Sequence, residues 1–142
     1  MTKVSFYKLA GDQALALALA CQLVQKSLAA NQQVLCLVAD NIAAQQLDEM
    51  LWAFNRASFV PHAQSVDHMP VAISFDEEPG EHHQVLINLQ AQIPTWFSRF
   101  ERVIEIIYEQ PDYEQAKRDN FRFYKERGYQ LEFHDLSERF KP

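Results

Sequence analysis

The first part of the chain alternates between short apolar runs and longer amphipathic ones. Residues 3–9, KVSFYKL, are rich in β-branched and aromatic side chains and are followed by Gly11 and Asp12, which predicts a strand that ends in a turn. Asp12 is also placed to cap a helix, because its carboxylate can accept hydrogen bonds from the free N–H groups of the first turn. Apolar residues then recur every three or four positions, so we expect a helix that runs to about Asn31.

A second strand and a second helix follow. Residues 33–40, QVLCLVAD, form a nearly continuous apolar run, as expected of a strand that is covered on both faces. Asp40 and Asn41 then open a helical segment, IAAQQLDEMLWAF, at residues 42–54. Strand, helix, strand and helix joined by short connections favour right-handed crossovers. The predicted fold class is therefore α/β, with a mostly parallel sheet between layers of helices.

The remainder of the chain continues in this manner after one irregular stretch. Two prolines interrupt any regular element in residues 55–70, and a polar turn is expected at residues 76–83. A short helix is expected at residues 95–100, and the last helix should begin at Pro111 and end at Gly128, which suits a left-handed C-terminal position. Further strands are expected at residues 71–75, 84–89, 102–109 and 129–136.

Composition indicates one folded domain in a reducing compartment. The 142 residues are 48% hydrophobic and 23% charged with only 3 glycines, which is typical of a globular protein, so residues 1–142 are assigned to a single domain. Cys21 and Cys36 lack a partner at metal spacing, and we expect buried free thiols. No secretory leader or membrane-spanning run is evident, so the predicted location is the cytoplasm, without membrane contact.

The charge balance limits what the protein can bind. The formal net charge of −6 and the sequence pI near 5.3 argue against tight general binding to DNA. Such binding draws its free energy from many Lys and Arg side chains that neutralise phosphates. Any contact with DNA is therefore expected to be indirect.

Cations and aromatic rings are concentrated in the last predicted helix, in the segment AKRDNFRFYKERGY, residues 116–129. On a helical wheel, Arg118, Arg122 and Lys125 fall within about 60° of one another, away from the core, and Phe121 and Lys117 fall at the edge nearest the core. This surface is either a solvated face or a site where guanidinium groups and a ring bind a carboxylate-bearing peptide. The core side is predicted to contain Tyr113, Ala116, Asn120, Phe123 and Tyr124.

Three stretches together resemble one known family. They are VSFYKL near the start, LDEMLWAFNRASFVPH at residues 47–62 and KRDNFRFYKERGYQLEF at residues 117–133. Their order and spacing are similar to those of the chi subunit of bacterial DNA polymerase III, a small part of the clamp-loader assembly. The resemblance implies a Rossmann-like three-layer sandwich without a nucleotide-binding loop. It also implies two protein partners: the psi subunit, and the acidic C-terminal tail of the single-stranded-DNA-binding protein, which ends in phenylalanine with a free carboxylate.

The resemblance assigns the tail-binding role to the last helix. The family's tail-binding positions correspond to Arg118, Phe121 and Arg122, with Lys117 and Lys125 as electrostatic support. Phe121 stands where the best-known family pattern has a tyrosine, so the ring is kept and the hydroxyl is lost. Glu114 stands where that pattern has a cation.

A second apolar segment is assigned to psi by the same resemblance. The stretch LWAFNRASFVPH, residues 51–62, carries more apolar surface than a short loop usually does, although packing in the core at the end of a helix is plausible for Leu51 and Phe54. The residues expected to contact psi are Trp52, Phe59, Val60, Pro61 and His62.

Enzyme activity is not expected, and neither catalytic residues nor a cofactor are assigned. The turn after the first strand contains one glycine, against the three of a dinucleotide fingerprint. Glu81, His82 and His83, with His62 and His68 elsewhere, suggest a metal-dependent hydrolase as an alternative, but polar surface explains them better and no metal is assigned. A peptide-binding module outside replication is the nearer alternative. The favoured prediction is a non-catalytic replication adaptor between clamp loader and coated single-stranded DNA.

Overall fold

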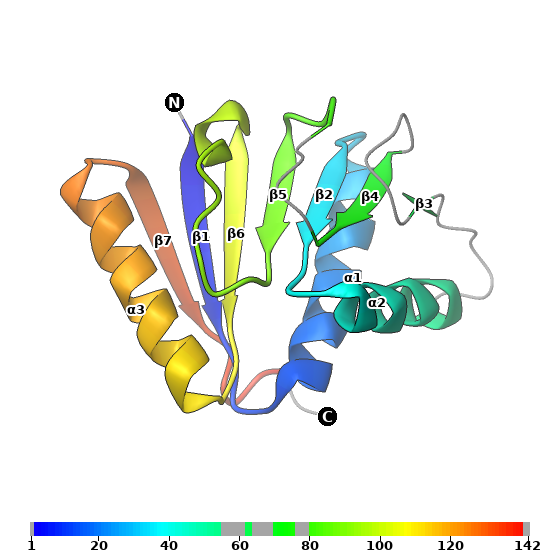
Figure 1. Cartoon of the computed structure of the whole chain (residues 1–142), viewed down its shortest axis with the longest axis horizontal. Coiled ribbons are helices and arrows are strands. Elements are labelled where there is room, and N and C mark those ends of the chain that lie inside the picture. Colours follow the sequence, from blue (N-terminus) through cyan, green and yellow to red (C-terminus); the bar gives the residue numbers. More distant parts are fainter. Residues whose placement is uncertain (1, 55–61, 64–69, 76–79, 141–142) are drawn as a thin grey trace.

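The computed structural model describes residues 2–54, 62–63, 70–75 and 80–140 as an α/β sandwich (Figure 1). A parallel sheet lies in the middle, α1 and α2 lie on one face, and α3 lies on the other. The predicted Rossmann-like α/β class is confirmed.

The sheet is parallel throughout the described part of the chain. Its order is β3-β4-β2-β5-β6-β1-β7, and each neighbouring pair is parallel. Parallel neighbours require crossover connections, and α1, α2 and α3 lie in those from β1 to β2, from β2 to β3 and from β6 to β7. The strands are β1 (Lys3–Lys8), β2 (Val34–Leu37), β3 (His62–Ala63), β4 (Val71–Ser74), β5 (Val85–Asn88), β6 (Arg102–Ile107) and β7 (Gln130–Asp135).

The helices begin where the sequence supplies caps. The Asp12 carboxylate accepts from the N–H of Leu15 at 3.3 Å, and the Asp40 carboxylate accepts from the N–H of Ala43 at 2.8 Å. None of the helices in the described ranges is long and apolar enough to cross a membrane. The helices are α1 (Gln13–Ala29), α2 (Asn41–Phe54), the short 3₁₀ helix η1 (Phe97–Arg99) and α3 (Pro111–Glu126).

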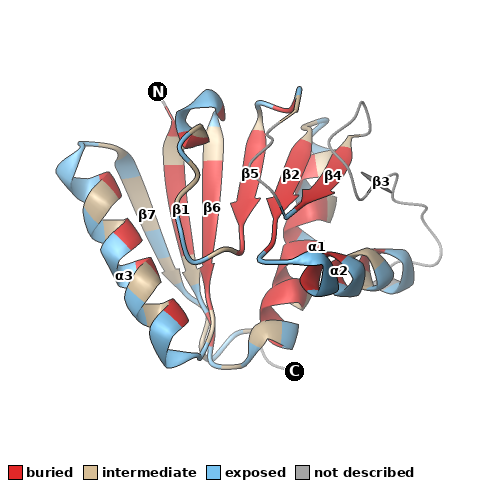
Figure 2. Ribbon diagram, in the orientation of Figure 1, coloured by how far each residue is buried: buried red, intermediate tan, exposed pale blue. Residues whose placement is uncertain are grey.

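Alternation along the strands divides the core into two clusters, one on each face of the sheet. In β1, Val4 and Phe6 pack on the side of α3, and Tyr7 packs on the side of α1. Strands β2, β4 and β5 are buried at every position, as expected of parallel strands covered on both faces (Figure 2). β7 is more exposed because it is an edge strand that pairs only with β1 in the described sheet.

Most predicted elements appear with shifted ends. α1 ends at Ala29 instead of about Asn31, and β2 covers four residues within the predicted 33–40. The two-residue strand β3 lies in the stretch where no regular element was expected. Gly128 follows α3 with φ of 80°, the predicted left-handed conformation.

The two cysteines are buried free thiols, as predicted. Burial raises the pKa of the Cys21 thiol to about 12, and it also raises the pKa of Cys36. Both side chains therefore act as small apolar core residues.

Candidate functional site

Helix α3 is well defined at its N-terminal end. The Gln110 side chain accepts a hydrogen bond from the N–H of Tyr113 at 2.6 Å, and Pro111 occupies the first helical position, where its missing N–H costs nothing. Asp112 and Glu114 lie in the first turn and Lys125 in the last, an arrangement that the helix dipole favours.

One stripe of α3 faces the sheet. Tyr113, Lys117, Asn120 and Tyr124 are buried, at a spacing of three or four residues. The core role predicted for Tyr113, Asn120 and Tyr124 is confirmed, whereas Lys117, predicted at the edge nearest the core as electrostatic support for the tail, is fully buried. Of the other residues predicted to face the core, Ala116 and Phe123 are only half-buried.

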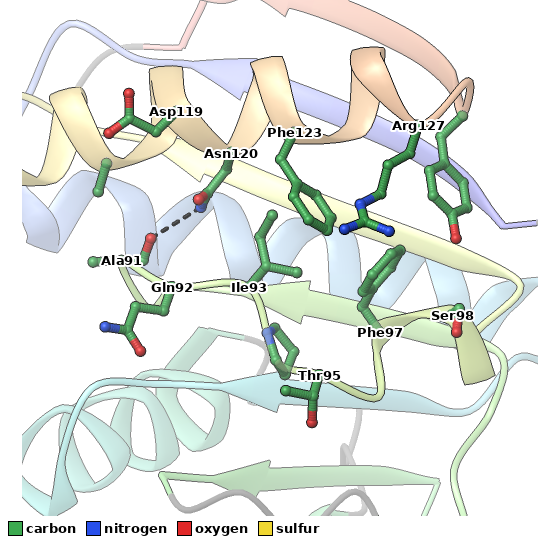
Figure 3. Close-up of a pocket in the computed structure, with 13 residues that line it drawn as sticks. Ala91, Gln92, Ile93, Thr95, Phe97, Ser98, Asp119, Asn120, Phe123 and Arg127 are labelled. Atoms are coloured by element: carbon green, nitrogen blue, oxygen red, sulfur yellow. Dashed lines mark hydrogen bonds between the residues drawn. The ribbon is translucent and has the colours of Figure 1, made fainter.

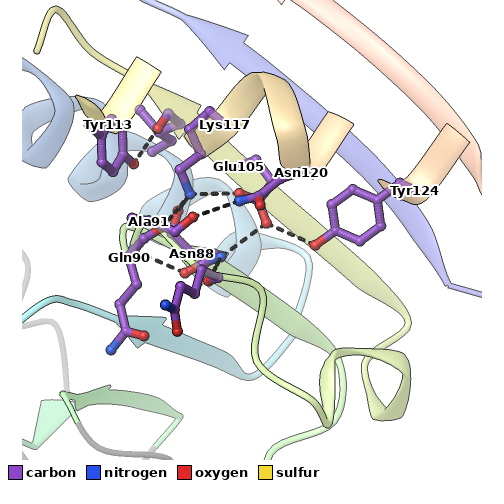
Figure 4. Close-up of polar contacts among 10 residues, drawn as sticks. Asn88, Gln90, Ala91, Glu105, Tyr113, Lys117, Asn120 and Tyr124 are labelled. Carbon is purple, nitrogen blue, oxygen red and sulfur yellow. Dashed lines mark hydrogen bonds and ion pairs between the residues drawn. The ribbon is translucent and has the colours of Figure 1, made fainter. Parts of the chain in front are cut away.

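The structure corrects the role predicted for Lys117, which was expected to support tail binding. Its side chain is 0% exposed, and its Nζ lies 2.6 Å from Oε1 of Glu105 on β6, which is also 0% exposed. The same ammonium donates to the carbonyl oxygens of Asn88 at 3.2 Å and Gln90 at 2.6 Å (Figure 4). Lys117 therefore lies inside the protein and not on the outward cationic face.

The second oxygen of the Glu105 carboxylate is also occupied. Tyr124 donates its hydroxyl to Oε2 at 2.8 Å, and Asn88 donates its amide to the same oxygen at 3.0 Å (Figure 4). Burial lowers the pKa of Lys117, and the neighbouring Glu105 opposes that change, while burial and Glu105 together raise the pKa of Tyr124. The charge on Glu105 is thus matched by three donors in a site that water does not reach.

The opposite side of α3 carries three exposed cations. They form an outward face that consists of Arg118, Arg122 and Lys125, separated by four and three residues, so their side chains neighbour one another. None of the three forms an ion pair with another residue in the described ranges, Glu114 included. The predicted outward position of these three residues is therefore found.

An aromatic pair borders the outward face. Phe121 is half-buried and contacts Phe6 of β1 edge to face, with ring centroids 5.2 Å apart. Its ring also meets that of Phe133 on β7 at 6.1 Å, and Phe133 is 51% exposed. Phe133 is not among the residues predicted to bind the tail. The strand register pairs Phe133 with Phe6, so the alternation of side chains along β7 puts both rings on the same face of the sheet. This position can be predicted only if β7 is known to lie beside β1.

A groove lies on the other flank of α3. It has a volume of about 780 Å³ and runs between the helix and residues 91–98 (Figure 3). Asn120 donates to the carbonyl of Ala91 at 2.9 Å, and the Arg127 guanidinium lies 4.4 Å from the centroid of the Phe123 ring. Arg127 thus belongs to the groove and not to the outward face, although it follows the same helix.

The segment assigned to psi is described only in part. Trp52 lies on α2 and is 49% exposed. His62 contributes its backbone to β3 beside β4. Phe59, Val60 and Pro61 lie outside the described residues. Of the predicted psi contacts, Trp52 is therefore the side chain that the structure places.

The histidines do not assemble a metal centre in the part of the chain that the structure describes. No group of three or more His, Cys, Asp or Glu side chains there could hold a metal ion. His82 is buried, and His83 is exposed with Nδ1 3.5 Å from the carbonyl oxygen of Glu81. His68 lies outside the described residues.

The fold and the outward face define a Rossmann-like α/β protein with a cationic and aromatic surface on its last helix. A family model described as DNA polymerase III chi subunit, HolC, matches residues 1–132. DNA polymerase III subunit chi of Pseudomonas aeruginosa is 40% identical over 139 residues, which cover 96% of this chain and 98% of that protein. The subunit chi of Escherichia coli is 25% identical over 118 residues, 80% of each chain. The chain therefore belongs to the chi-subunit family of DNA polymerase III, and its role lies in DNA replication.

The buried ion pair generates a stability prediction. Lys117→Met leaves the Glu105 carboxylate buried without its cation, which should lower the free energy of unfolding by about 3–5 kcal/mol. The matched control, Lys125→Met, removes an exposed cation from the same helix and should change it by less than about 0.5 kcal/mol. Urea unfolding followed by circular dichroism measures both, and equal losses would contradict a structural role for the pair.

Proposed function

We propose that this protein is a non-catalytic adaptor of the DNA polymerase III holoenzyme. It joins the clamp loader, through psi, to the C-terminal tail of single-stranded-DNA-binding protein in the cytoplasm, with residues 1–142 acting as one chi-like domain. The observation that carries the proposal is the outward face of α3, where unpaired cations border the rings of Phe121 and Phe133. Family membership supports the replication role.

The chemistry of the outward face suits an acidic peptide that ends in phenylalanine. Arg118 and Arg122 are one helical turn apart, so both guanidinium groups can reach one terminal carboxylate and bind it through paired hydrogen bonds. The exposed ring of Phe133, with Phe121 behind it, offers apolar surface for the phenyl side chain of the peptide. Lys125 adds attraction for the acidic residues that precede it.

Two features weaken the electrostatic attraction between the outward face and an acidic tail. The chain carries a net charge of −6, which repels an acidic tail until it reaches the local cations. Glu114 lies one turn before Arg118 and reduces the positive potential at that end of the outward face. A modest affinity for a single tail follows, and several tails on one DNA-bound oligomer would raise the effective concentration enough for durable attachment.

Loss of either arginine should weaken tail binding. A hydrogen-bonded charge contact is worth about 1.5–3 kcal/mol, so Arg118→Ala or Arg122→Ala should each raise the dissociation constant for a tail peptide about tenfold or more. Binding should also weaken as salt rises, because these contacts are solvent-exposed. Fluorescence anisotropy of a labelled tail peptide measures both effects.

Arg127→Ala is the matched control for these variants. This variant removes a guanidinium group at the end of the same helix, but one that lines the groove and not the outward face. It should therefore leave the affinity for the tail peptide unchanged. If Arg127→Ala abolishes binding while Arg118→Ala does not, the peptide lies in the groove and the outward face is the wrong site.

We assign psi to a separate surface near the end of α2. Helices α2 and α3 pack on opposite faces of the sheet, so a partner on Trp52 leaves the outward face of α3 accessible. A half-exposed tryptophan is a common anchor of protein interfaces because its large ring is buried at low entropic cost. Phe59, Val60, Pro61 and His62 follow in the sequence and extend the proposed contact.

The psi assignment predicts a selective loss of one partner. Trp52→Ala and Phe59→Ala should each weaken association with psi by about thirtyfold, the effect of losing an interface anchor worth about 2 kcal/mol. The control Ile42→Ala truncates a residue of the same helix that is 68% exposed and should have no effect. Pull-down measures how much psi each variant recovers, and tail binding is the second readout. Unchanged recovery of psi with both variants would contradict the assignment.

A further inference from the structure

A small pocket lies on the face of the sheet opposite to α3. It has a volume of about 400 Å³ and lies between α1, strands β1 and β6, and the turn that follows β7. Leu23 of α1 and Ile104 of β6 form part of its apolar wall, and Leu136 and Phe140 contribute from the turn. This pocket shares no residue with the outward face or with the groove beside α3.

Three cations from distant parts of the sequence meet at this pocket. Lys26 comes from the last turn of α1, Arg102 from the start of β6 and Arg139 from the turn after β7. Within the described ranges, none of them forms an ion pair with a carboxylate. In a chain with a net charge of −6, three unpaired cations around one cavity indicate a place for an anion.

Glu132, on the strand across β1 from Arg102, is engaged with other side chains. Glu132 of β7 accepts from the ammonium of Lys3 at 2.6 Å and lies 3.3 Å from Nε2 of His134. Hydrogen bonds from these two side chains lower the pKa of Glu132. Glu132 therefore does not neutralise Arg102.

Arg102 itself lacks a strong partner. Its Nη2 is 3.4 Å from the Ser5 hydroxyl and 3.3 Å from the Tyr7 hydroxyl, both long contacts with neutral groups. Its Nε is buried and has no hydrogen-bond partner among the residues that the structure describes. A buried donor without an acceptor is costly, and the cost is removed when a ligand supplies the acceptor.

We propose that this pocket binds a phosphate monoester with a small apolar body. A phosphate group offers several acceptor oxygens and up to two negative charges, which match Arg102 and the exposed ends of Lys26 and Arg139. The leucine and isoleucine wall takes the apolar body, and the volume lies within the range of small-molecule sites. The proposal is independent of tail binding, since the outward face of α3 lies on the other side of the sheet, and none of the residues that line the pocket is among those assigned to psi.

Titration of the full chain with phenyl phosphate tests the proposal, with amide chemical shifts as the readout. Saturable shifts should cluster at residues 22–27, 102–104 and 136–140, with a dissociation constant below about 10 mM. Inorganic phosphate and benzoate are the comparison probes, and each should bind at least about tenfold more weakly than phenyl phosphate. If benzoate binds as tightly as phenyl phosphate, the pocket does not select a phosphate group. If inorganic phosphate binds as tightly as phenyl phosphate, the apolar wall does not contribute to ligand binding.

Variants distinguish binding in this pocket from nonspecific attraction of the anion to other cations. Lys26→Ala and Arg139→Ala change exposed residues, so the fold is retained, and each should weaken phenyl phosphate binding at least threefold, a small electrostatic loss. Arg102→Gln should abolish binding. Arg127→Ala, which removes an exposed guanidinium group from the α3 side of the sheet outside the proposed tail site, is the control and should change nothing. Failure to saturate, or shifts confined to the outward face of α3, would overturn the proposal.

Discussion

The buried ion pair between Lys117 and Glu105 fixes how α3 lies on the sheet. Rotating the helix by one residue, about 100°, would leave a carboxylate uncompensated in the core, so the pair selects one orientation even if its net contribution to stability is small. The bonds from Lys117 to the carbonyls of Asn88 and Gln90 attach the segment after β5 to the same helix. The directions of the outward face and of the groove both follow from this orientation.

The order of elements was predictable from the sequence because strand and helix periodicities are local. The helical wheel put Lys117 at the edge nearest the core, but its predicted role as electrostatic support for the tail took no account of a buried carboxylate on another element, which holds it inside. A warning was present in RVIEIIYE, where Glu105 stands between Ile104 and Ile106 in a strand that is otherwise apolar at its centre. Phe133 was missed because its place depends on the pairing of β7 with β1, which no local pattern encodes.

The exposed cations of this acidic chain are concentrated on separate surfaces. Arg118, Arg122 and Lys125 lie on the outer surface of α3, while Lys26, Arg102 and Arg139 surround a pocket on the other face of the sheet. Trp52 presents an aromatic ring on α2, on the face of the sheet opposite to α3. The parallel sheet separates Trp52 from the outward face of α3, so the two proposed protein partners would not compete for the same residues.

Calorimetric titration with an acidic peptide that ends in Asp-Phe, beside the same peptide with an amidated C-terminus, tests whether the outward face of α3 binds a terminal carboxylate. The free-acid peptide should bind and amidation should abolish binding, since the paired guanidinium groups of Arg118 and Arg122 require a carboxylate. Equal binding of the two peptides, or no binding of either, would contradict the assignment of the outward face to the tail.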